Sequence, residues 1–110
     1  MALRSARLLD ERHGLAVRVL DLRWLAPLDH AAVAAHARDC RRVIVLDEGR
    51  RSGGIGEALL AGLVEQGCGG LPIRLVVGAD SYQPLGPAAG LLLPNEDQVV
   101  AAAEALCVGQ

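Results

Sequence analysis

The stretch from Val43 to Glu57 decides the fold class, and it reads Val-Ile-Val-Leu-Asp-Glu-Gly-Arg-Arg-Ser-Gly-Gly-Ile-Gly-Glu. Its first four residues, Val43–Leu46, form a short continuous apolar run, which is typical of a β-strand covered on both faces. A glycine-rich loop occupies residues 49–56, and the pattern beyond it predicts a helix from Glu57 to Gln66. A covered strand, a glycine loop and a helix in this order predict an α/β domain with a mainly parallel sheet.

The residues that precede this unit repeat the same alternation of element types. Apolar periodicity predicts a helix over Ala2–Arg12, closed by His13-Gly14. The aliphatic and β-branched run Leu15–Leu20 predicts a strand. Asp29 is the expected N-cap of a helix over Ala32–Arg38, because its side chain can accept a hydrogen bond from a free amide of the first turn.

The residues that follow complete a layered domain. Leu71–Val77 predicts another strand, and Gly, Pro and Ser signals predict an ordered loop over residues 78–94. Asn95 is the expected cap of a last helix, whose apolar face comprises Val99, Val100, Ala103 and Leu106. The expected fold is a three-layer α/β/α domain over residues 1–110. Doubly wound domains normally open with a strand, so an initial strand is missing from this pattern.

Composition excludes several classes of partner. The chain has 110 residues with 11 basic and 13 acidic side chains and a net charge of −2, so it lacks the electrostatic footprint of a protein that binds nucleic acid or an anionic membrane. It has no apolar run of membrane-spanning length and no signal-peptide layout at Met1, which predicts a cytoplasmic protein. Cys40, Cys68 and Cys107 are far apart and outside any metal-binding spacing, which predicts three buried thiols.

The glycine loop is the sharpest candidate site. Bare amides at a helix N-terminus favour an anion, and Arg50 and Arg51 would add positive charge. However, the loop has neither Walker nor G-x-G-x-x-G spacing, and Glu57 would compete with a phosphate. The alternative, which the sequence favours, is structural: the glycines at 53, 54 and 56 permit positive φ and close packing of helix on sheet, and Ser52 helps to cap the helix.

Other polar residues assemble no catalytic constellation. Asp47 and Glu48 end the strand, but adjacent strand residues point to opposite faces, so salt bridges to Arg23 or to the loop arginines are expected rather than shared catalysis. We therefore predict no catalytic, cofactor-binding or metal-binding residue in this chain. The two aromatic residues, Trp24 and Tyr82, indicate either a protein interface or a plug at the end of the core.

The order of motifs resembles a known family. Residues 19–29 (Val-Leu-Asp-Leu-Arg-Trp-Leu-Ala-Pro-Leu-Asp), 43–57 and 71–80 (Leu-Pro-Ile-Arg-Leu-Val-Val-Gly-Ala-Asp) are similar, in order and spacing, to segments of the transketolase C-terminal-like domain. The similarity is strongest to the β-type part of thiamine diphosphate-dependent 2-oxo acid dehydrogenases. It spans residues 2–107, and it includes 81–86 and 93–97.

The resemblance implies a role in assembly. Family enzymes decarboxylate a 2-oxo acid on thiamine diphosphate with magnesium and pass the acyl group to an acyltransferase core, while the cofactor and the catalytic histidines lie in other domains. The C-terminal domain supplies subunit contacts within a dimer or heterotetramer and, in several complexes, the docking surface for the core. The positions to which the resemblance gives a structural or interface role are Asp21, Arg23, Glu48, Gly53, Gly54, Gly56 and Glu57.

The chain also departs from the family. The family's first strand, which lies in mid-sheet between the strands at residues 15–20 and 43–47, is absent, so a fragment of a longer enzyme is expected. Relatives that dock the core place an acid where this chain has Gly69-Gly70, so docking there is not expected. Two alternatives stay open: the same domain of a transketolase or deoxyxylulose-phosphate synthase, and a free-standing anion- or nucleotide-binding domain that uses residues 49–56.

Overall fold

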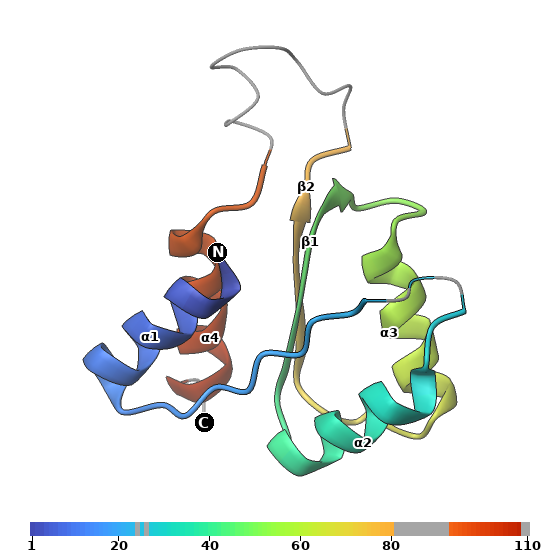
Figure 1. The fold of residues 1–110 in the computed structure, drawn as a ribbon, viewed down its shortest axis with the longest axis horizontal. Coiled ribbons are helices and arrows are strands. Elements are labelled where there is room, and N and C mark those ends of the chain that lie inside the picture. Colours follow the sequence, from blue (N-terminus) through green and yellow to red (C-terminus); the bar gives the residue numbers. More distant parts are fainter. Residues whose placement is uncertain (24, 26, 81–92, 109–110) are drawn as a thin grey trace.

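A computed structural model describes residues 1–23, 25, 27–80 and 93–108 (Figure 1). Its elements in chain order are α1 (Ala2–His13), α2 (His30–Cys40), β1 (Val43–Arg50), α3 (Ile55–Glu65), β2 (Ile73–Gly78) and α4 (Glu96–Val108). The four predicted helices and the two later strands are confirmed. The predictions made for Trp24 and Tyr82, and the similarity at 81–86, fall outside the described residues.

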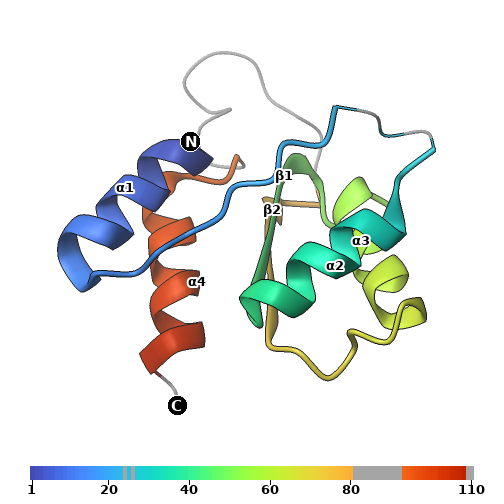
Figure 2. The same cartoon turned by 60° about the horizontal axis from the view of Figure 1, so that its bottom comes forward.

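The sheet and its helices form three layers. β1 and β2 are parallel neighbours, in register from Val43 opposite Ile73 to Asp47 opposite Val77, with an irregularity before Arg50 reaches Gly78. Helices α1 and α4 lie against one face of this sheet, and α2 and α3 lie against the other (Figures 1 and 2). The three-layer α/β/α architecture predicted from the sequence is therefore observed, with α3 as the crossover between the two strands.

Each face of the sheet has its own apolar cluster. On the α2–α3 side the buried residues are Ala34, Ala37, Leu63 and Cys68, with Val43 and Ile73 of the strands packed against them. On the α1–α4 side they are Leu9, Val100 and Ala103, and Ile44 packs against these. Neighbouring residues of β1 thus point to opposite faces, which explains why its sequence is a continuous apolar run.

The helix ends follow the signals in the sequence. The Asp29 side chain accepts a hydrogen bond of 3.0 Å from the Ala32 amide at the start of α2, as predicted. At the start of α4, the Asn95 side chain accepts from the Gln98 amide at 2.9 Å, and the Gln98 side chain accepts from the Asn95 amide at 3.0 Å. This reciprocal pair is a capping box, which satisfies two amides that the helix leaves free.

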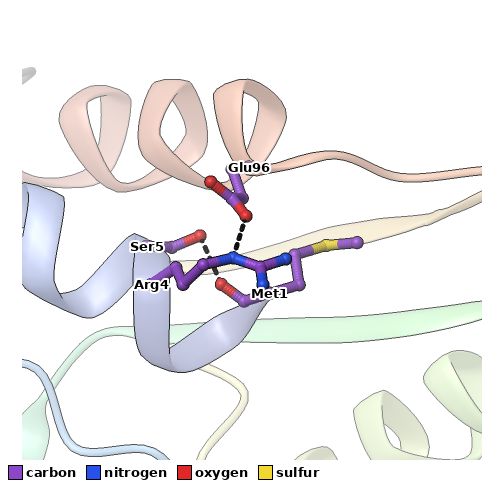
Figure 3. Close-up of polar contacts among 4 residues, drawn as sticks. All are labelled: Met1, Arg4, Ser5 and Glu96. Carbon is purple, nitrogen blue, oxygen red and sulfur yellow. Dashed lines mark hydrogen bonds and ion pairs between the residues drawn. The ribbon is translucent and has the colours of Figure 1, made fainter.

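Helices α1 and α4 run side by side in the same direction. Arg4 forms an ion pair with Glu96 near the start of both helices (Figure 3), and His13 near the end of α1 contacts Glu104 at 2.9 Å between Nε2 and Oε1. Ser5, which is buried, donates its hydroxyl to the Met1 carbonyl at 2.9 Å. Because Leu9 and Val100 bury apolar surface between these polar ends, the pair forms a layer that covers one face of the sheet.

Residues 15–20 are not a strand, which corrects the prediction for Leu15–Leu20. The segment leads from the α1 layer towards α2 without entering the sheet (Figures 1 and 2), and Val17, Val19 and Leu20 are 45%, 36% and 43% exposed. The side chains have the strand propensity that was recognised, but that propensity is realised only against a neighbouring strand. Among the described residues, no such neighbour lies beside the segment.

Two further findings concern the cysteines and the helices. Cys68 is buried and Cys107 is half-buried, but Cys40 is exposed at the end of α2, so the prediction of three buried thiols is wrong for Cys40. Within the described part of the chain, no helix is both long and apolar enough to cross a bilayer.

Candidate functional site

The carboxyl ends of the two parallel strands meet at one edge of the sheet, where ligands of open α/β sheets usually bind. The turn after β1 spans residues 51–54, and Asp80 follows β2. The candidate anion loop of the sequence therefore lies beside a carboxylate from the neighbouring strand. Whether this edge can hold an anion depends on which groups the loop amides already contact.

Asp80 occupies one side of the loop. Its Oδ1 accepts a hydrogen bond of 2.8 Å from the Ser52 amide, and its Oδ2 accepts one of 2.5 Å from the Ser52 hydroxyl. The hydroxyl bond, then the amide bond, and more weakly the positive charge of Arg50, lower the pKa of Asp80 below its ordinary value. Ser52 thus binds Asp80, and the residue at the N-cap of α3 is Gly54, so the prediction that Ser52 caps the helix is wrong.

Glu57 occupies the other side of the loop. It lies in the first turn of α3, where a negative charge interacts favourably with the helix dipole, and its Oε2 accepts a hydrogen bond of 2.9 Å from the Gly53 amide. The amides of Ser52 and Gly53 are therefore both bonded to carboxylates of the protein itself. Arg50 and Arg51 are exposed beside this edge, but two of the loop amides that an anion could use are already engaged.

Each of the three loop glycines is explained by a different structural constraint. Gly53 has φ of +67°, a left-handed conformation that favours glycine. Gly54 has an ordinary φ of −87°, but a Cβ atom there would lie 2.3 Å from the Arg50 carbonyl oxygen. Gly56 is buried, and its Cβ would lie 3.2 Å from Val77 Cγ1. The structural interpretation of the loop thus accounts for all three glycines.

The acids at the end of β1 do not form the predicted salt bridges. Asp47 Oδ1 accepts a hydrogen bond of 3.1 Å from the Gly49 amide, and Glu48 is exposed. Arg23 pairs instead with Asp21, at 3.3 Å between Nε and Oδ2, and both side chains are largely exposed. Among the described residues, neither Asp47 nor Glu48 has an arginine within ion-pair distance. For Arg23, the reason is the path of residues 15–23, which do not extend the sheet beside β1.

Comparison with known proteins identifies the family. The model of the transketolase C-terminal domain matches residues 1–99. The chain is 34% identical over 92 residues to the pyruvate dehydrogenase E1 component subunit beta of Staphylococcus aureus (strain Mu50 / ATCC 700699), a match that covers 82% of this chain and 28% of that protein. It is 32% identical over 97 residues to the subunit of the same name of Staphylococcus epidermidis (strain ATCC 12228 / FDA PCI 1200), covering 86% and 30%. The chain belongs to the transketolase C-terminal domain family. It spans less than a third of the length of these curated relatives.

In this transketolase C-terminal domain, Asp21 and Arg23 lie at the rim of a mostly apolar hollow of about 600 Å³. Leu20 and Leu22 line it from one side, and α2 lines it from the other. The remaining lining residues are Pro27, Asp29, Ala32, Val33 and His36. Six described residues of the matched motif, at 20–23, 27 and 29, therefore line this hollow at the surface.

Sequence reasoning missed the pairing of Ser52 with Asp80. Both residues lie inside the motifs that resemble the family, but no contact between them was predicted. A usable signal existed, because the carboxyl ends of neighbouring parallel strands lie together, and Asp80 comes directly after the second strand as Ser52 follows the first. Within the described residues, no group of three or more His, Cys, Asp or Glu side chains is arranged to hold a metal ion.

The Asp80 contacts predict a pH-dependent contribution to stability. Because the folded-state pKa of Asp80 is lowered, its contribution is present above the unfolded-state pKa of about 4 and is lost as the pH falls through the folded-state value. We expect Asp80→Ala to lower the melting temperature at pH 7. Below about pH 4, the melting temperature of this variant should approach that of the parent chain. Thermal melts from pH 3 to about 8 measure this difference. Asp10→Ala, on an exposed part of α1, is the control, and a difference for Asp80→Ala that persists unchanged in acid would contradict the role of its charge.

Proposed function

We propose that this chain is the non-catalytic assembly domain of the decarboxylating component of a thiamine diphosphate-dependent 2-oxo acid dehydrogenase. The observation that carries the proposal is its similarity, over 82% to 86% of its residues, to proteins named pyruvate dehydrogenase E1 component subunit beta. The family match over residues 1–99 supports the same assignment. The names of these relatives make pyruvate the first 2-oxo acid to test in the complete enzyme.

The described residues do not fit thiamine diphosphate or its magnesium ion. The one loop that resembles a diphosphate cradle has its Ser52 and Gly53 amides bonded to Asp80 and Glu57. These two carboxylates would repel a diphosphate, and no described cluster of acids replaces them as a metal site. We therefore assign cofactor binding in the parent enzyme to domains outside these residues.

The proposed partners are the remaining domains and subunits of the parent enzyme, in a dimer or heterotetramer. The exposed pair of Asp21 and Arg23 beside the apolar hollow supports this assignment, because protein interfaces combine an apolar centre with a polar rim. Gly69 and Gly70 are exposed and offer no carboxylate. The proposal therefore does not include docking of an acyltransferase core at that position.

Calorimetric titration of the purified chain with thiamine diphosphate and magnesium tests the proposal. We expect no heat of binding, because the Ser52 and Gly53 amides of the loop are bonded to carboxylates of the protein itself. Binding in the micromolar range would overturn the assignment of an assembly role.

Thermal melts with inorganic phosphate or ATP test the competing anion-binding function. A ligand that binds the folded chain raises its melting temperature by mass action. We expect no shift, and a clear phosphate-dependent rise would favour an anion-binding module that uses residues 49–56. The coding DNA upstream of Met1 supplies an independent result: an open frame that encodes a thiamine-binding domain supports the assembly role.

A further inference from the structure

We draw no further inference here: the strongest candidate, the mostly apolar hollow of about 600 Å³ between residues 20–23 and α2, already belongs to the interface proposed above, and nothing in the described residues shows what covers it.

Discussion

Gly54→Ala should destabilise the domain by about 2–3 kcal/mol or more, because an added methyl group in a packed position forces the backbone to shift. The Cβ atom would lie 2.3 Å from the Arg50 carbonyl oxygen, and a backbone atom cannot move aside as a flexible side chain can. The cause is this close approach and not a forbidden dihedral angle, since φ at Gly54 is −87°. Urea unfolding at one fixed protein concentration measures the free energy of unfolding.

Gly70→Ala is the control for the Gly54 change. A Cβ atom at Gly70 would meet no heavy atom within 4 Å, so its effect should stay within about 0.5 kcal/mol. Addition of phosphate should leave the Gly54→Ala deficit unchanged, because the loop amides are bonded to Asp80 and Glu57. A Gly54→Ala chain as stable as the parent would show that the turn after β1 does not take this conformation.

Leu63→Ala should cost about 2–5 kcal/mol of unfolding free energy, the range for removing a large side chain from a core. Leu63 is 1% exposed and contacts the cluster of Ala34, Ala37 and Cys68. The other buried members of that cluster are small, and the larger side chains packed against it include Val43 and Ile73 of the strands. The expected result is a midpoint of urea unfolding that falls with little change in the slope.

Val64→Ala is the matched control, one residue along the same helix. Val64 is 56% exposed, and alanine has a higher helix propensity than valine, so its effect should be small or slightly stabilising. Equal losses for the two substitutions would contradict the packing of Leu63, on α3, against α2. Both measurements need the same protein concentration, because self-association would make the apparent stability depend on it.

Local signals predicted the helices because each one depends on residues close in sequence. Asp29 and Asn95 were recognised as caps, and both accept the expected amide bonds at the starts of α2 and α4. The strand at β1 was recognised from a continuous apolar run that both layers of helices cover. At residues 15–20 the same kind of reasoning was wrong, because a strand exists only beside another strand.

At the candidate site too, local features were predicted from the sequence and contacts between distant segments were not. The loop after β1, the glycines and Glu57 at the helix start were visible in the sequence, and so was the choice between an anion site and a structural turn. The contact between Ser52 and Asp80 spans 28 residues, and only the parallel pairing of β1 with β2 brings the two together. It bonds the amide and hydroxyl of Ser52 to a carboxylate of the protein, which favours the structural alternative.

By itself, the sequence of this chain determined its α/β class, its helix boundaries to within a few residues and its family, because periodicity, caps and motif order are properties of neighbouring residues. The tertiary structure alone decided that residues 15–20 stay outside the sheet. It also decided that the Arg50 carbonyl leaves no room for a Cβ atom at Gly54, and that Asp80 accepts a hydrogen bond from the Ser52 amide of the loop. The physical reason is that hydrogen-bond partners and steric contacts between distant segments exist only after β1, β2 and the helices have packed together.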